Sequence, residues 1–209
     1  MKKNKILFFM LLLFIVTTSN VLAWEMTAKG IKGGVNFATF SGPDSEFYES
    51  APQKLTTFSV GGFLVYTKDD KINIQPEIYY SRKGAKYDED GYGLNFKVDY
   101  IDIPVLGTYE IAENIRVFAG PSLGIYMGGT YEFLDDGSIE ESGNLDEAAT
   151  MSGIDFGLVL GGSYTINKIV LDARYAFSLT TIIKEWELED DTSVNVKKSL
   201  IQLLIGYKF

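Results

Sequence analysis

The sequence contains neither cysteine nor histidine. Without cysteine the chain has no disulfide framework, no thiol chemistry and no cysteine for a lipid anchor. Because histidine is missing as well, the usual zinc ligands and the usual general base at neutral pH are absent. The formal net charge of −9 argues against nucleic acid as a partner. These absences favour a protein that is not an enzyme and that uses no metal or cofactor.

Long apolar runs are scarce, and the one that stands out lies at the N-terminus. Lys2, Lys3 and Lys5 precede an apolar run over residues 6–16, and residues 21–23 have the small or aliphatic side chains of a cleavage site. This pattern predicts a signal peptide over residues 1–23, cleaved to leave one domain over residues 24–209. An uncleaved anchor is the alternative, but the run is shorter than the ~20 residues that a spanning helix needs.

In place of long apolar runs, the sequence has alternation with a period of two. In the last segment one face carries Ile201, Leu203, Ile205, Tyr207 and Phe209, and the other carries Gln202, Gly206 and Lys208. This period is that of a β-strand, and a helix with the same sequence would have no coherent face. The pattern predicts eight strands, over residues 32–40, 56–66, 71–82, 94–109, 115–133, 152–164, 168–181 and 194–209.

The connections between these segments alternate between short and long. Residues 68–71, 110–114 and 165–168 are tight connections, whereas residues 42–55, 84–93, 134–151 and 182–193 are long and polar. Outer-membrane barrels sort their loops in this way, with short periplasmic turns and longer extracellular loops. Because lipid offers no water to unpaired backbone groups, such strands must close. We therefore predict an all-β fold, an eight-stranded antiparallel up-and-down transmembrane β-barrel with both termini in the periplasm.

The aromatic residues support the same topology, because amphipathic rings favour the boundary between lipid headgroups and hydrocarbon. Five of them are expected to form the periplasmic girdle: Tyr66, Tyr109, Tyr164, Tyr207 and Phe209. Seven others are expected in the opposite girdle: Phe37, Phe58, Tyr80, Phe96, Tyr131, Phe133 and Phe177.

The fourth predicted strand has a break in its apolar phase. Phe96, Val98 and Tyr100 alternate with polar residues, and then Ile101 and Ile103 take over the apolar register. A β-bulge near Tyr100 would explain this change.

An eight-stranded barrel has an interior that side chains can fill. The charged residues predicted to face inward are Glu77, Lys97, Asp99, Asp102, Arg116, Asp155, Asp172 and Arg174. We interpret them as a lumen charge network of paired residues, because an unpaired buried charge is costly. Asp172 and Arg174 lie two apart on one face, where pairing is the simplest arrangement. The alternatives are a narrow ion path and a catalytic carboxylate cluster, which would need a solvent-open cleft.

Two of the long loops are acidic, at residues 135–148 and 184–191. Carboxylate clusters can hold Ca²⁺ or bridge through divalent ions to lipopolysaccharide phosphates. No spacing matches an EF-hand loop, so a solvated acidic rim is the favoured interpretation. Trp186 lies alone among these acids, either as a partner contact or on the rim of the upper girdle.

Several stretches resemble a known family. They are DYIDIPVLGTYEI over residues 99–111, IRVFAGPSLGIY over residues 115–126, LDARYAFSL over residues 171–179 and the terminal GYKF. They resemble the PorT-like outer-membrane β-barrel family of Bacteroidota, over essentially the whole chain after residue 23. The resemblance implies an eight-stranded outer-membrane barrel of the porin family. The namesake of the family is associated with secretion through the type IX system, and most members have no assigned role.

These observations predict a non-enzymatic, integral outer-membrane protein with a structural or interaction role, accessory to protein secretion if it shares its namesake's function. Its expected partners are outer-membrane lipid and lipopolysaccharide, the assembly machinery during insertion, and secretion-system components, and the barrel is expected to be monomeric. One alternative is a narrow channel for ions or small solutes. Another is a soluble ligand-binding barrel of the lipocalin kind, which the sorted loops and the aromatic girdles argue against.

Overall fold

The computed structural model describes residues 24–45, 50–68, 71–89, 91–147, 149–186 and 193–209. The predicted signal peptide lies outside these residues. No helix in the described part of the chain is long and apolar enough to cross a membrane.

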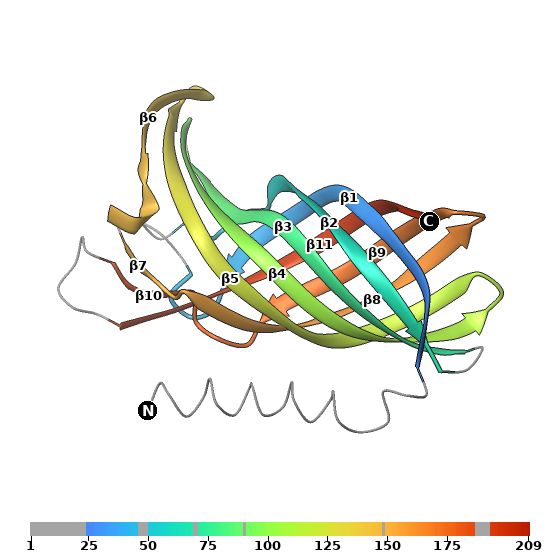
Figure 1. Ribbon diagram of the computed structural model, residues 1–209. Helices are drawn as coiled ribbons and strands as arrows, with labels where there is room; N and C mark the ends of the chain where they lie inside the picture. Colours follow the sequence, from blue (N-terminus) through green and yellow to red (C-terminus); the bar gives the residue numbers. More distant parts are fainter. Residues whose placement is uncertain (1–23, 46–49, 69–70, 90, 148, 187–192) are drawn as a thin grey trace.

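Eight long strands form a closed ring (Figure 1). They are β1 (Glu25–Ser41), β2 (Leu55–Thr67), β3 (Ile72–Glu89), β4 (Tyr92–Ala112), β5 (Ile115–Asp135), β8 (Ile154–Ile166), β9 (Ile169–Ser178) and β11 (Ser193–Lys208). Each strand pairs antiparallel with its neighbour, and β1 pairs with β11 to close the barrel. The predicted eight-stranded antiparallel up-and-down barrel is confirmed.

The two ends of the barrel differ. At one end, here called the turn end, short connections join β2 to β3, β4 to β5 and β8 to β9. Asn114 and Asn167 occupy two of these turns with φ values of 65° and 54°, a left-handed conformation that asparagine tolerates well. The start of β1 and the C-terminus lie at the same end, where the amide of Phe209 donates to the carbonyl of Lys29 at 2.9 Å (Figure 1).

The opposite end, here called the loop end, contains more regular structure than the sequence predicts. It holds β6 (Ser138–Asn144), the 3₁₀ helix η2 (Leu145–Glu147), β7 (Ala149–Met151) and β10 (Ile183–Trp186). The predicted polar loop at residues 84–93 is wrong, because β3 and β4 continue almost to the turn that joins them. Strand pairing satisfies the backbone hydrogen bonds of these polar segments, so they extend the sheet beyond the barrel wall.

The alternation seen in the sequence becomes two different surfaces. On β11 the side chains of Ile201, Leu203 and Ile205 are 40–58% exposed on the outer face. Leu200 and Leu204, on the opposite face, are buried inside the ring. The outer surface is therefore apolar around this part of the wall, as a membrane-spanning barrel requires.

Strand β4 reverses this arrangement toward the loop end. Phe96, Val98 and Tyr100 are buried inside the barrel, and Leu106 is buried on the same inward face farther along the strand. The same alternate residues of β4 therefore face inward along the strand, and what changes is whether the apolar residues lie on the inward or the outward face. The register does shift between Asp99 and Tyr100, as a bulge near Tyr100 predicts, but the extra residue belongs to β5, where Met127 has no paired partner on β4.

Candidate functional site

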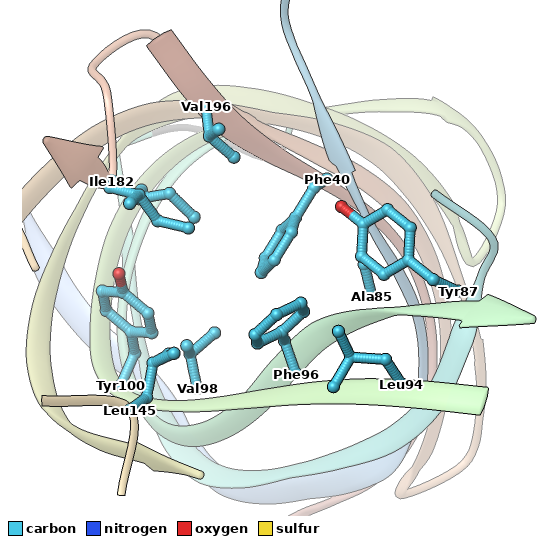
Figure 2. Close-up of a cluster of buried hydrophobic side chains, with 11 residues drawn as sticks. Phe40, Ala85, Tyr87, Leu94, Phe96, Val98, Tyr100, Leu145, Ile182 and Val196 are labelled. Atoms are coloured by element: carbon cyan, nitrogen blue, oxygen red, sulfur yellow. The ribbon is translucent and has the colours of Figure 1, made fainter. Parts of the chain in front are cut away.

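The loop end of the lumen is closed by an apolar cap. Its buried members are Phe40, Ala85, Tyr87, Leu94, Phe96, Val98, Tyr100, Leu145, Ile182, Ile183 and Val196. Figure 2 shows that the labelled side chains converge on the centre of the ring from different elements. The ring centroid of Phe96 lies 5.8 Å from that of Tyr87 and 6.2 Å from that of Phe40. Leu145 of η2 and Ile183 of β10 show that the loop elements supply part of this cap.

Beneath the cap lies a group of four charged side chains, here called the cap-side cluster: the buried Lys83, Asp155 and Lys198 and the partly buried Asp102. The Nζ atom of Lys83 lies 2.6 Å from Oδ2 of Asp102, and the Nζ atom of Lys198 lies 2.9 Å from Oδ2 of Asp155. Both ammonium groups face the ring of Tyr100, which adds a cation–π contact to each. The formal charges of the two lysines and two aspartates in this cluster cancel.

A second group of buried charges, the turn-side cluster, consists of Lys32, Glu77, Asp172 and Arg174. Arg174 donates to Glu77 at 2.6 Å and to Asp172 at 2.8 Å. Lys32 donates to the same two carboxylates, at 3.0 and 2.8 Å. Each acid thus contacts both bases, and the side chains are at most 1% exposed. Complete pairing of this kind is what a buried charge requires.

Aromatic rings enclose the turn-side cluster. The guanidinium of Arg174 lies 5.6 Å from the ring centroid of Tyr79 and 5.1 Å from that of Phe118. Gly161 makes this packing possible, because a side chain there would collide with Arg174 and Phe118. Glycine at this inward position therefore serves the filling of the lumen.

A neutral hydrogen-bonded layer separates the two charge clusters. Asn36 donates to Ser59 at 2.8 Å and accepts from Gln202 at 2.9 Å, and the hydroxyls of Ser59 and Ser81 lie 2.8 Å apart. All four side chains are buried. The lumen thus contains the cap, the cap-side cluster, this amide and hydroxyl layer and the turn-side cluster. It also contains a second buried apolar cluster, formed by Leu106, Phe118 and Val159.

The structure separates the predicted lumen residues into groups. Glu77, Asp172 and Arg174 come together in the turn-side cluster, and Asp102 and Asp155 belong to the cap-side cluster. Arg116 lies near the turn end, 2.7 Å from Glu110, with both side chains about 30% exposed. The predicted network is therefore two closed clusters and one pair at the rim.

Two of the predicted inward residues are corrected. Because Phe96, Val98 and Tyr100 face the lumen, Lys97 and Asp99 between them face outward. Lys97 pairs there with Glu132 of β5, and Asp99 pairs with Arg82 of β3. The prediction failed because it took the apolar face of β4 to be the outer face along the whole strand.

Three lumen lysines were missed in the sequence: Lys32, Lys83 and Lys198. A signal was present for Lys32, which alternates with the outward Ile31 and shares the inward face of Asn36. Lys83 lay one residue beyond the predicted end of its strand. For Lys198 a signal was present, because it lies within the predicted last strand on the same face as Gln202. Each lysine pairs with acids from other strands, so sequence spacing alone does not reveal the partner.

The predicted aromatic residues divide in a similar way. The rings expected near the periplasmic interface lie on the outer wall toward the turn end: Tyr66, Tyr109, Tyr164, Tyr207 and Phe209. Phe58 and Tyr80 pack together toward the loop end, with centroids 5.8 Å apart. Phe96 and Tyr131 are corrections, because Phe96 belongs to the apolar cap and Tyr131 packs against it.

The chemistry available in the lumen is that of a structural filling. The carboxylates of both clusters are bound by ammonium or guanidinium groups, and their side chains are at most 13% exposed. Within the described residues, no three acidic side chains converge in a way that could hold a metal ion. The arrangement therefore supplies rigidity and closure.

Comparisons with known proteins agree with this architecture. A family model described as "Outer membrane protein beta-barrel domain" matches residues 24–184. The chain belongs to this family. Its membership makes the barrel an integral outer-membrane protein, consistent with the exposed apolar belt. No curated protein matches the sequence.

Solved structures share the fold at low sequence identity. One is the attachment invasion locus protein Ail of Yersinia pestis, with 15% identity and a TM-score of 0.50, covering 88% of this chain and 100% of that one. Another is Neisserial surface protein A, with 15% identity and a TM-score of 0.50, covering 87% and 97%. Ail has also been solved with the heparin analogue sucrose octasulfate. At these identities the likeness shows the fold alone.

Proposed function

We propose that this protein is a closed, non-enzymatic outer-membrane barrel that works as an interaction protein, with its loop end outside the cell and its turn end in the periplasm. The observation that carries this proposal is the filled lumen. A barrel that conducts needs a continuous water path, whereas here the apolar cap and the two charge clusters occupy successive levels. The wall and its filling are then a rigid support for what stands on the loop end.

In this proposal the loop end carries the surface that binds a partner. The strands β4 and β5 are 21 residues each, longer than the 9 to 11 residues that span a bilayer, so they rise beyond the rest of the barrel (Figure 1). This extension is ordered by strand pairing with β6. Extended strands that hold a sheet in solvent supply a fixed surface for binding.

The proposed partners follow from this placement. Outer-membrane lipid surrounds the wall, lipopolysaccharide borders the loop end, and the assembly machinery acts during insertion. Secretion-system components are the partner class suggested by the resemblance to PorT-like barrels, and that part of the proposal rests on the resemblance alone. Deleting the gene in the native host and comparing the proteins released into the medium tests it: lost cargo supports the secretion role, and an unchanged set of secreted proteins removes it.

A channel is the competing function. It is opposed by the buried pairs of the turn-side cluster, whose side chains leave no exposed path between the charges. Opening such a path would require Arg174 and Lys32 to leave their carboxylates, which is costly inside a protein.

The orientation is tested with single cysteines, because the natural chain has none. Ser138→Cys places a thiol after the turn between β5 and β6, and Glu113→Cys places one in the turn between β4 and β5 at the other end. A membrane-impermeant maleimide added to intact cells is expected to label the Ser138→Cys protein. The Glu113→Cys protein should react only after the outer membrane is permeabilised. The reverse pattern would overturn the proposed orientation.

A further inference from the structure

The sheet at the loop end has an open edge. Strand β6 pairs with β5 and, among the described residues, with no other strand. Its residues are exposed apart from the partly buried Gly143. Figure 1 shows β6 beside the projecting ends of β4 and β5, beyond the rest of the barrel. An edge of this kind presents backbone donors and acceptors in the spacing of a strand.

The hairpin that carries this edge is well defined. Asp136 and Gly137 form its turn with φ values of 46° and 79°, the combination found in tight two-residue hairpins. The amide of Asp136 also donates to the carbonyl of Gly91 at 3.0 Å, which ties the turn to the neighbouring β3–β4 turn. The edge is thus held in place by the rest of the sheet.

A groove lies beside the same edge. It has a volume of about 510 Å³ and is lined from β5 by Met127, Gly128 and Gly129, and from the opposite wall by Ser142, Gly143 and Asp146. It occurs where β5 is no longer paired with β8 and is not yet paired with β6. Met127 is 61% exposed there, so the groove offers an apolar contact next to a carboxylate. An aliphatic side chain that ends in a cation matches both features.

The negative charge around β6 indicates which kind of partner the edge can bind. Residues 130–147 contain seven acids and no lysine or arginine. Glu132 pairs with Lys97. In the part of the chain described here, the other six form no ion pair: Asp135, Asp136, Glu140, Glu141, Asp146 and Glu147. Such an edge repels a second copy of itself and any polyanion, and it attracts a basic segment.

We propose that the free edge of β6 binds an extended, lysine- or arginine-rich segment of a partner protein, which adds a strand to the sheet and places a basic side chain in the groove beside Asp146. Backbone pairing along β6 gives the segment its strand conformation, and the carboxylates give the preference for basic residues. This inference rests on the proposed function, because it names the partner class for the same loop end.

The test uses the full-length barrel in detergent and a short synthetic peptide of alternating lysine and valine. Three controls accompany it: the same peptide N-methylated at every residue so that neither of its edges can donate backbone hydrogen bonds, a peptide of alternating glutamate and valine, and sucrose octasulfate as a polyanion. We expect the lysine peptide alone to bind, and its affinity to fall with rising salt. Equal binding of the N-methylated peptide, or binding of the glutamate peptide or the polyanion in its place, would overturn the proposal.

Variants locate the site on the surface. The triple variant Glu140→Gln, Glu141→Gln, Asp146→Asn should bind the lysine peptide about tenfold more weakly, because several exposed charge contacts are lost together. The double variant Glu25→Gln, Glu113→Gln removes charge from the turn end and should bind as the natural protein does. Equal losses in both would mean that net charge attracts the peptide and would overturn the assignment to β6.

A steric pair completes the design. Ser142→Trp fills the groove and should weaken binding, whereas Glu113→Trp, in the β4–β5 turn at the other end of the barrel, should leave it unchanged. No binding of the lysine peptide to the natural barrel would overturn this inference. The proposed function would still stand if Ser138→Cys is labelled on intact cells, so the two failures can be told apart.

Discussion

Arg174 and Glu77 lie 97 positions apart in the sequence, yet the Nη1 atom of Arg174 is 2.6 Å from Oε2 of Glu77 inside the barrel. The bond joins β9 to β3 across the lumen, because these two strands are not neighbours in the ring. Asp172 and Lys32 complete the arrangement from β9 and β1. The turn-side cluster therefore links separate parts of the wall, and its integrity is tied to the stability of the closed barrel.

Replacing Arg174 with alanine leaves Lys32 as the one cation paired with Glu77 and Asp172 among the described residues. We expect the free energy of unfolding to fall by about 3–5 kcal/mol, because a buried charge loses its compensation. The temperature at which the folded band disappears in heat-dependent gel mobility, and a urea titration, measure this loss. Arg116→Ala removes a partly exposed pair at the rim and should cost less than about 1 kcal/mol. Similar losses in both variants would contradict the distinction.

The corrected facing of β4 gives a second comparison. Asp172→Asn disturbs a fully buried cluster and should cost about 3 kcal/mol or more. Asp99→Asn disturbs the exposed outer pair with Arg82, whose side chains are 22% and 37% exposed, and should cost less than about 1 kcal/mol. A loss for Asp99→Asn as large as that for Asp172→Asn in the same urea titration would place Asp99 in the lumen after all.

The apolar cap predicts a third effect. Phe96→Ala opens a cavity among Phe40, Tyr87 and their neighbours and should destabilise the barrel by about 3–5 kcal/mol. Tyr92→Ala, at a residue that is 70% exposed beside the β3–β4 turn, should change stability by about 0.5 kcal/mol or less. Protease digestion of the loop end would report the local effect, since Leu145 and Ile183 pack into the same cap. An unchanged digestion pattern for Phe96→Ala would show that the loop elements do not depend on the cap.

A fourth prediction concerns the apolar outer face of the barrel wall. Leu203 is 47% exposed in the apolar belt, and Leu203→Arg puts a charge against lipid hydrocarbon. We expect a loss of about 2–4 kcal/mol in folding into lipid vesicles, measured by urea titration. Glu113→Arg changes charge in a turn outside the wall and serves as the control. A folding free energy for Leu203→Arg equal to that of the control would mean that this face does not meet lipid.

The wall of the barrel could be predicted from the sequence because it follows from short-range rules. Alternation with a period of two identifies β11 through Ile201, Leu203 and Ile205, and tight turns at Asn114 and Asn167 mark strand ends. Closure follows from the need to pair every backbone group in lipid. These features need no knowledge of which strands meet across the lumen.

The loop end could not be predicted by the same rules, because there the apolar residues of β4 lie on the inward face and not on the outer face. At the loop end the apolar residues of β4 face inward, so Phe96 and Val98 cap the lumen while Lys97 pairs with Glu132 on the outer face. The alternation is unchanged, and only the environment of each face differs. A sequence pattern reports the period of a strand and does not report which of its faces is in contact with lipid at each level.

The lumen pairs could not be predicted for a different reason. Lys32 meets Glu77 and Asp172 because the tilt and stagger of the strands bring these levels together. Spacing along one strand revealed only the local pair of Asp172 with Arg174. Which residues of other strands become ion-pair partners depends on the combined register of all eight strand pairings in the ring.

Conductance in planar bilayers is the most direct test of a closed barrel. The purified full-length protein should insert without discrete, stable current steps, because the apolar cap and both charge clusters fill the lumen. Insertion is verified in the same preparation by heat-dependent gel mobility. Silence from folded, inserted protein is the predicted result. Reproducible single-channel openings by the natural protein would contradict the closed lumen and favour the narrow channel.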